Sequence, residues 1–234
     1  MIGGRSLQDS QDVSRSISDL RPAAPHPRVT AVVLAAGESS RLGAFKPLLP
    51  WPDEDSAETL LGYQVRQLRA AGLGPVIVVT GNRADEVAAA ASAAGAVAVH
   101  NVGYQSGKAG SVRLGVAAVP EGMLLLIVGV DQPRPAWIFR QLAEALLGGC
   151  QLVIPTYSGR RGHPLLLAAH LRNELLAVQE ESLGLRAVVQ RHAAAVTYVE
   201  IGSPLVLVNL NTQEDLVAAR RLLAVRTSRR DSLP

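Results

Sequence analysis

The stretch VTAVVLAAGESSRLGAFK, Val29 to Lys46, joins a short apolar run to a loop rich in glycine, serine and basic residues. The apolar run predicts a buried strand that ends where the glycines begin. A loop that only turns the chain needs Gly37 or Gly43, and it does not need charge. Glycines also let the backbone approach an anion closely, and Arg41 and Lys46 supply positive charge that can spread over phosphates. The stretch therefore predicts a phosphate-binding loop, with a plain strand-to-helix turn as the alternative.

The spacing of this loop differs from two common phosphate-binding motifs. The dinucleotide fingerprint GxGxxG is absent from it. A Walker A loop is excluded because the interval from Gly37 to Gly43 is too long and a proline follows Lys46. The string SGKAGS, 106–111, lacks the hydroxyl residue after the lysine and the glycine spacing of that motif.

Apolar runs of strand length alternate with helical patterns after the loop. Strands are predicted at 29–35, 75–81, 96–100, 123–130 and 151–155, and helices at 58–72, 84–95, 111–119 and 135–147. Continuous apolar strands separated by helices predict an α/β fold of three layers, with a mostly parallel sheet covered by helices on both faces. Ligands bind at the carboxyl ends of such strands, so the loop and VDQP, 130–133, can share one crevice.

The composition of the 234-residue chain indicates one domain with polar ends. We predict a disordered extension at 1–28, a domain at 29–225 and a disordered tail at 226–234. The net charge of +3 is small, several arginines lie in the ends, and aromatic residues make up only 3% of the chain. These features give no reason to expect a nucleic-acid partner.

The single cysteine and the short apolar runs indicate where in the cell the protein is expected. Cys150 has no second cysteine with which to form an internal disulfide, which favours a reducing, cytoplasmic setting. No apolar run approaches the roughly 18 residues that a membrane span requires, and the first residues lack the apolar core of a secretory signal. We therefore expect a cytoplasmic protein without a membrane partner.

The motifs, taken in order, resemble a known family. LAAGxSxRxGxxK, Leu34 to Lys46, looks like the signature loop of nucleoside triphosphate-dependent nucleotidyltransferases. Four later segments are similar to the MobA-like and MocA-like group that acts on the molybdenum cofactor: NVGYQSGKAGSVRLG (101–115), VDQP (130–133), GRRGHP (159–164) and NLNTQEDL (209–216). The resemblance covers the domain at 29–225.

The resemblance implies a fold, a reaction and partners. The fold would be the Rossmann-like nucleotide-diphospho transferase fold. The enzyme would use Mg²⁺, take CMP from CTP or GMP from GTP, join it to the phosphate of molybdopterin, and release pyrophosphate. Its substrates would be small molecules, and a molybdoenzyme that receives the cofactor would be a protein partner.

The same resemblance assigns the nucleotide to the first half of the domain. Lys46 would hold the triphosphate and Arg41 the departing pyrophosphate. An alanine at position 36 is similar to the cytidine-using members. Backbone groups for the base would come from Leu34, Ala35, Ala36 and Gly37, and further contacts from Asn101 and Ser111. A core-facing or capping role is the alternative for the last two residues.

Two oxygen-bearing side chains are the candidates for the metal. Asp131 follows an apolar strand, so its carboxylate should emerge at the carboxyl end, and Mg²⁺ prefers oxygen ligands. The alternative for Asp131 is a cap on the helix after Pro133. Asn209 would be the second ligand, at a position where MocA-type relatives usually show aspartate. Its alternative is a turn asparagine at the start of the last helix.

The segment GRRGHP is the expected acceptor side. Arg160 and Arg161 would bind the acceptor phosphate, Gly162 would let the chain approach it, and His163 is either a general base or a structural residue before proline. MocA-type relatives usually continue with a GDxGxR-like run, whereas this chain reads ESLGLR, 181–186. The acceptor therefore stays open between molybdopterin and a sugar or polyol phosphate. A cofactor-binding accessory protein without efficient catalysis is a further alternative.

Overall fold

The computed structural model describes residues 28–181 and 184–230. The predicted disordered extension lies, apart from residue 28, outside the described residues, and so does the end of the predicted tail, 231–234. The last helix, α7 (Gln213–Arg230), continues into the first residues of that predicted tail.

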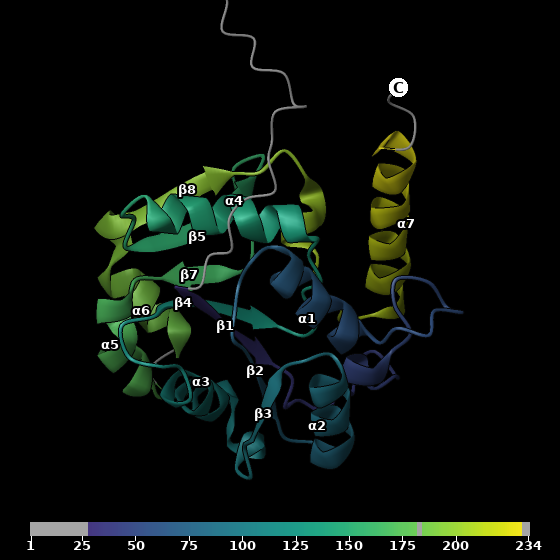
Figure 1. The fold of residues 1–234 in the computed structure, drawn as a ribbon, viewed down its shortest axis with the longest axis horizontal. Coiled ribbons are helices and arrows are strands. Elements are labelled where there is room, and N and C mark those ends of the chain that lie inside the picture. Colours follow the sequence, from purple (N-terminus) through teal and green to yellow (C-terminus); the bar gives the residue numbers. More distant parts are fainter. Residues whose placement is uncertain (1–27, 182–183, 231–234) are drawn as a thin grey trace, which may run out of the picture.

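An eight-stranded sheet forms the middle layer of the domain (Figure 1). Four neighbouring strands are parallel: β3 (Val97–His100), β2 (Val76–Thr80), β1 (Val29–Leu34) and β4 (Leu124–Gly129). Next comes β7 (Leu165–Leu167), which is antiparallel to both β4 and β5 (Leu152–Tyr157). The short β6 (Arg160–Arg161) pairs antiparallel with β5, and β8 (Val196–Glu200) pairs parallel with it. The prediction of a mostly parallel sheet is confirmed.

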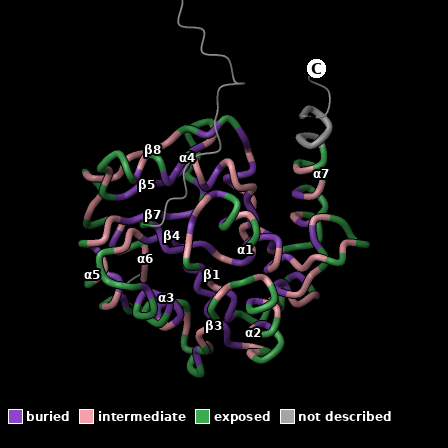
Figure 2. The backbone as a smooth tube through the Cα atoms, in the orientation of Figure 1, coloured by how far each residue is buried: buried purple, intermediate pink, exposed green. Residues whose placement is uncertain are grey.

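Helices cover both faces of this sheet. On one face lie α1 (Leu60–Ala70), α2 (Ala84–Ala93) and α4 (Ala136–Leu147), and on the other lie α3 (Lys108–Ala117), α5 (Arg172–Leu176) and α6 (Leu185–Arg191). Strand residues alternate between the two cores, so that Ala31 and Val33 join the first and Val32 joins the second. Burial on both sides explains why β1 is a continuous apolar run, and Figure 2 shows the central strands as buried. The predicted three-layer α/β fold is confirmed.

Short 3-10 turns connect several of these elements. They lie at η2 (Lys46–Leu48), η3 (Tyr104–Ser106), η4 (Ala169–Leu171), η5 (Ala193–Ala195) and η6 (Pro204–Leu207). Among the described helices, none combines the length and the apolar character that crossing a bilayer requires.

A third, smaller core fastens the loop after β1 to the end of the chain. It consists of Leu42, Trp51, Leu60, Tyr63, Leu210, Leu216 and Ala219. Trp51 is fully buried and meets the Tyr63 ring edge to face, with 6.2 Å between the centroids. Aromatic pairs prefer this geometry. The cluster therefore holds the glycine-rich loop beside the segment that precedes α7.

The strand order places a crevice beside β1. The chain runs outward from β1 to β2 and β3, and then returns to the opposite side of β1 to form β4. Connections that leave two neighbouring parallel strands in opposite directions open a crevice at their carboxyl ends. Leu34 ends β1 directly beside Gly129 at the end of β4, so the loops that follow both strands meet there.

Candidate active site

Contacts within the protein fix the glycine-rich loop. Ser39 adopts a left-handed backbone conformation with φ of 61°, and its hydroxyl oxygen accepts a hydrogen bond of 3.1 Å from the Lys46 amide. The Gln213 side chain, at the start of α7, donates to the Leu42 carbonyl at 2.8 Å, and the Leu42 side chain is buried. The loop thus presents its basic side chains from a defined backbone.

The structure brings the three residues with a predicted catalytic role to one place. Lys46 Nζ lies 3.5 Å from Asp131 Oδ2 and donates to Asn211 Oδ1 at 3.3 Å. Arg41 Nη2 donates to the same Asn211 oxygen at 3.4 Å. Lys46 is only 8% exposed, so its ammonium depends on these acceptors for part of its solvation. Arg41 is exposed and extends the positive charge outward.

Asp131 leaves the sheet as the sequence predicts. It follows the end of β4 by two residues, and its side chain is 24% exposed. The next long helix, α4, starts after Pro135 and has no side-chain cap, so the capping alternative for Asp131 does not apply. Gly129 makes room for this turn, because a Cβ there would collide with Asp131 Oδ1.

A network of side-chain amides holds the Asp131 turn on both sides. Gln64 is fully buried in α1, and its Nε2 donates to the carbonyls of Gly129 at 3.0 Å and Gln132 at 3.3 Å. Gln132 Oε1 accepts from the Gly129 amide at 3.0 Å, and Gln132 Nε2 donates to Asn209 Oδ1 at 2.8 Å. The main chain adds a bond of 2.8 Å from the Leu210 amide to the Asp131 carbonyl. Asn209 therefore lies in the same crevice as Asp131.

The start of α7 is capped by residues other than Asn209. The Asp215 amide donates to the Thr212 hydroxyl at 3.2 Å, while the Asp215 carboxylate accepts from the amides of Asn211 and Thr212 at 3.0 Å each. Reciprocal bonds of this kind resemble a capping box. The cap is therefore Thr212, while the Asn209 side chain donates to the Leu207 carbonyl at 3.4 Å and accepts from Gln132.

The oxygen donors fit a hard cation that arrives with its substrate. Among the described residues, no cluster of three or more His, Cys, Asp or Glu side chains could hold a metal ion. Asp131 offers a carboxylate, and Asn209 offers an amide oxygen with one lone pair used by Gln132. Mg²⁺ keeps several waters and is commonly bound by one or two carboxylates together with substrate phosphates. The residues present match that mode of binding better than a closed protein cage.

The backbone predicted to meet the nucleotide base is partly engaged in the fold. The Leu34 carbonyl accepts from Val130 at 3.0 Å, and the Ala35 amide donates to Val79 at 2.9 Å. The Ala36 carbonyl accepts from Asn82 at 3.0 Å. Within the described part of the chain, the amides of Ala36 and Gly37 donate to no protein group, so these donors remain for a ligand.

Asn101 and Ser111 lie together next to the third strand. Both are 4% exposed, and Asn101 Nδ2 donates to Ser111 Oγ at 2.9 Å. Asn101 Oδ1 accepts from the Gly103 amide at 3.1 Å. These bonds match the core-facing alternative and shape the turn that leads into α3.

The predicted acceptor segment divides between two locations. Arg160 and Arg161 form β6 at the sheet edge and are exposed, and the Arg161 guanidinium lies 4.9 Å from the centre of the Tyr198 ring. Gly162 is required by the fold, because a Cβ there would collide with the Val206 carbonyl. His163 lies at the other end of the segment, where its amide donates to that same carbonyl at 3.0 Å.

A fully buried arginine links the two sides of the crevice. The side chain of Arg134 donates to the carbonyls of His163, Val206 and Val208 at 3.2, 2.9 and 2.7 Å. Burial lowers the pKa of Arg134 to about 9, and its guanidinium stays protonated at neutral pH. Arg134 thus ties the turn after β4 to the segments that carry His163 and Asn209.

Sequence reasoning missed several of these residues. Gln64 lies on the apolar face of its helix, and a polar residue at such a position is a detectable signal of a buried hydrogen bond. Asn211 lies within the NLNT run, where its partners cannot be identified from local sequence. Arg134 follows DQP and resembles an ordinary surface arginine until the fold buries it.

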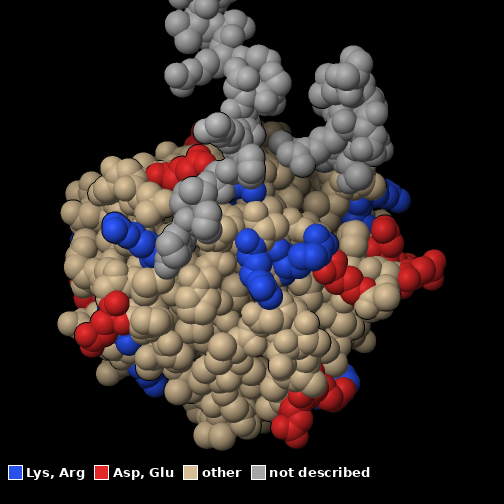
Figure 3. Space-filling model, in the orientation of Figure 1, with Lys and Arg blue, Asp and Glu red and all other residues tan. Residues whose placement is uncertain are grey.

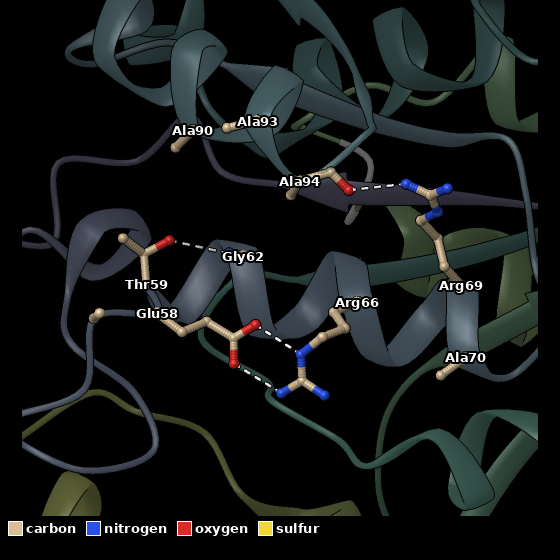
Figure 4. Close-up of a pocket in the computed structure, with 10 residues that line it drawn as sticks. Glu58, Thr59, Gly62, Arg66, Arg69, Ala70, Ala90, Ala93 and Ala94 are labelled. Atoms are coloured by element: carbon tan, nitrogen blue, oxygen red, sulfur yellow. Dashed lines mark hydrogen bonds and ion pairs between the residues drawn. The ribbon is translucent and has the colours of Figure 1, made fainter.

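A separate groove lies between α1 and α2, on the helical surface (Figure 4). It has a volume of about 650 Å³, and its lining includes several alanines together with Arg66 and Arg69. Both arginines are engaged: Arg66 pairs with Glu58 at 2.7 Å, and Arg69 donates to the Ala94 carbonyl at 3.1 Å. Figure 3 shows basic side chains gathered over this helical face. None of the predicted site residues lines the groove.

Comparisons with known proteins agree with this geometry. The model of the MobA-like NTP transferase domain matches residues 31–196. The molybdenum cofactor cytidylyltransferase of Escherichia coli is 24% identical over 82% of this chain and 95% of its own length. The nicotine blue oxidoreductase of Paenarthrobacter nicotinovorans is 31% identical over 74% of this chain and 87% of its own.

A solved structure supports the same assignment. A nucleotidyl transferase from Methanothermobacter thermautotroptrophicus superposes with a TM-score of 0.71 at 27% identity, covering 86% of this chain and 99% of the other. The signature loop, the strand order and the matched domain all agree, and the chain belongs to the MobA-like NTP transferase family.

Proposed function

We propose that the protein is a Mg²⁺-dependent cytidylyltransferase that transfers CMP from CTP to the phosphate of molybdopterin; GTP is the alternative donor. The observation that carries the proposal is the contact of Lys46 with Asp131 and Asn211 at the carboxyl ends of β1 and β4. The family supports nucleotidyl transfer, and the E. coli relative supports the choice of donor and acceptor. The cytoplasm is the expected site of action.

The reaction joins two anions, which determines what the residues must do. An oxygen of the acceptor phosphate attacks the α-phosphorus of CTP, and the bond from that phosphorus to the bridging oxygen breaks as pyrophosphate leaves. Such a transfer depends on alignment and charge neutralisation more than on a protein nucleophile. Lys46 binds the triphosphate and Arg41 the pyrophosphate side. The free amides of Ala36 and Gly37 bind the nucleotide, while Leu34, Ala35, Asn101 and Ser111 hold the surrounding backbone.

The metal and the acceptor complete the assignment. Asp131 and Asn209 would hold Mg²⁺, which when bound neutralises charge on the phosphate oxygens. A phosphate acceptor is already ionised at neutral pH, so His163 is not needed as a strong base. The resemblance assigns the acceptor phosphate to the segment with Arg160, Arg161, Gly162 and His163, although Arg161 packs against Tyr198 at the sheet edge. A molybdoenzyme would receive the product.

Other functions predict different behaviour. A sugar or polyol phosphate acceptor keeps the same nucleotide site, whereas an accessory protein would bind cofactor without turnover. The relative named as an oxidoreductase raises a third possibility. A nicotinamide-dependent enzyme would need a dinucleotide site, and the GxGxxG fingerprint of such a site is absent from the loop after β1.

Calorimetry tests the proposal directly. CTP, GTP, ATP and UTP are titrated with Mg²⁺ into the wild type, into Asp131→Ala, and into Asp53→Ala as an exposed acidic control. We expect CTP to bind most tightly and its affinity to fall in Asp131→Ala alone. Pyrophosphate release with molybdopterin then measures turnover. Equal or absent nucleotide binding would overturn the proposal, and binding without turnover on any phosphorylated acceptor would favour the accessory protein.

A further inference from the structure

His163 stands at the edge of the sheet where the site lies. Ile127 of β4 pairs with Leu165 of the antiparallel β7, so continuing both strands brings Gly129 and His163 to the same edge. His163 is exposed, while its main chain is held by the Val206 carbonyl and by Arg134. Its imidazole is therefore presented to solvent beside the Asp131 turn from a fixed backbone.

Lys108 approaches the same edge from α3. It is the first residue of that helix and is exposed. The Glu180 carboxylate accepts from the Ala109 amide at 2.7 Å and so occupies the amino end of α3. The Lys108 ammonium itself makes no hydrogen bond or ion pair within the described residues. A ligand would therefore be bound by the lysine side chain and not by the helix amides.

Arg186 reaches this place from α6. The segment before α6 is fastened to α3, because Arg113 Nη1 donates to the Val178 carbonyl at 2.6 Å. Arg186 is the second residue of α6, is exposed, and makes no hydrogen bond or ion pair with another described residue. Among residues 28–181 and 184–230, Lys108 and Arg186 therefore have no ion-pair partner, and the helix of the first is bonded to the segment that precedes the helix of the second.

The electrostatic surroundings of His163 agree with this arrangement of α3 and α6. Partial desolvation of the ring at the protein surface lowers the pKa of His163, and Arg134 lowers it further. Lys108 and Arg186 act in the same direction, whereas Asp131 opposes them. All four groups therefore lie within electrostatic range of one imidazole. The Arg161 guanidinium lies instead over the Tyr198 ring, 4.9 Å from its centre.

We propose that Lys108 and Arg186 bind the phosphate of the acceptor beside His163, and that the β6 arginines do not. The inference rests on the proposed function, because it places the attacking phosphate across from the nucleotide that Lys46 and Asp131 bind. Lys108 and Arg186 provide positive charge for a phosphate dianion, while the Glu180 carboxylate is already engaged by the Ala109 amide. The acceptor class is accordingly a phosphomonoester, whatever group it carries.

Orthophosphate serves as the probe because the acceptor is unidentified. The full-length protein is first saturated with Mg²⁺ and α,β-methylene-CTP, which occupies the triphosphate site, and orthophosphate is then titrated by calorimetry. The variants are Lys108→Met and Arg186→Met, which keep an unbranched side chain and remove the charge. Arg160→Met and Arg161→Met test the rival phosphate site at the exposed hairpin, and the exposed Arg221→Met on α7 is the matched control.

We expect Lys108→Met and Arg186→Met each to weaken orthophosphate binding about tenfold, with unchanged affinity for the nucleotide analogue. The Arg221→Met control should bind orthophosphate like the wild type, and the hairpin variants should show no comparable loss. Loss in the hairpin variants alone, or no measurable orthophosphate binding by the wild type, would overturn the inference. The inference would also be overturned if Lys108→Met weakened binding of the nucleotide analogue and left orthophosphate binding unchanged, because the lysine would then bind the nucleotide. If the analogue fails to bind the wild type, the proposed function fails, and orthophosphate titration of the same variants without nucleotide still decides the inference.

Discussion

The Lys46 ammonium lies 3.5 Å from the Asp131 carboxylate, although 85 residues separate the two in the chain. The register of β1 with β4 explains this proximity, because Leu34 pairs with Gly129 and both loops leave the sheet at one edge. The buried lysine also needs the Asn211 oxygen. The charged groups of the site are therefore positioned before any ligand arrives, which reduces the reorganisation that binding requires.

Replacement of Asn211 tests how far this positioning contributes to binding. Asn211→Ala removes the oxygen shared by Lys46 and Arg41, so both side chains must be ordered by the nucleotide itself. We expect Mg·CTP affinity to fall about tenfold, with little change in the free energy of unfolding. The exposed Asn173→Ala serves as the control. Calorimetry and urea unfolding measure the two quantities, and unchanged affinity would contradict a positioning role.

Substitutions of Gly37 and Gly162 should have different effects, the first on nucleotide binding and the second on stability. A Cβ at Gly37 would meet nothing within 4 Å, so Gly37→Ala should leave stability unchanged yet obstruct a nucleotide that approaches this backbone. A Cβ at Gly162 would collide with the Val206 carbonyl, so Gly162→Ala should lower the free energy of unfolding by about 2 kcal/mol. Unfolding curves and nucleotide titrations of both variants check the contrast. Normal nucleotide affinity in Gly37→Ala would show that the ligand does not approach there.

The buried Gln64 should matter through the turn that it holds. Gln64→Leu keeps similar volume but leaves the carbonyls of Gly129 and Gln132 without this donor. We expect a loss of about 3 kcal/mol in the free energy of unfolding and weaker Mg²⁺-dependent nucleotide binding. The control is Gln141→Leu on the exposed face of α4. Wild-type stability of Gln64→Leu would mean that other bonds suffice for the turn.

Arg134 should be among the most sensitive positions of the chain. Arg134→Met leaves the carbonyls of His163 and Val208 without this donor and the Val206 carbonyl with the His163 amide alone. We expect a loss of about 4 kcal/mol in the free energy of unfolding. Arg140→Met, which removes one bond to the Ala70 carbonyl, should cost about 1 kcal/mol. If Arg134→Met does not fold, Arg134→Lys keeps the charge and allows measurement by urea unfolding. A small effect in both Arg134 variants would contradict the role of the arginine as a link.

The fold was largely predictable, because its signals are local. The run that includes β1 is apolar without alternation, as a strand buried on both sides must be. β6, β7 and β8 were not predicted. The first two have only two and three residues and are defined by pairing with distant strands, and β8 is a five-residue strand that is only partly buried. Too few residues lie in such strands for periodicity to be detected.

The site was predictable where its residues follow strands, and less so elsewhere. Lys46 and Asp131 come after β1 and β4, so the general rule for α/β sheets locates both. Asn101 and Ser111 were placed on the nucleotide by resemblance, and the structure uses their polar atoms against each other. No local signal could indicate that Lys108 and Arg186 act on the same imidazole as Asp131.

By itself, the sequence determined the layers of this protein, the loop that presents cations, and the carboxylate across from it, because helical and strand periodicity and glycine content are properties of neighbouring residues. Only the tertiary structure decided which amides hold the Asp131 turn, which arginine is buried, and which cations remain unpaired. Those outcomes depend on side chains that meet across 65 or more residues of chain. Hydrogen bonds and ion pairs form between groups a few ångströms apart in space. The separation of two residues along the chain does not reveal whether their side chains will be that close.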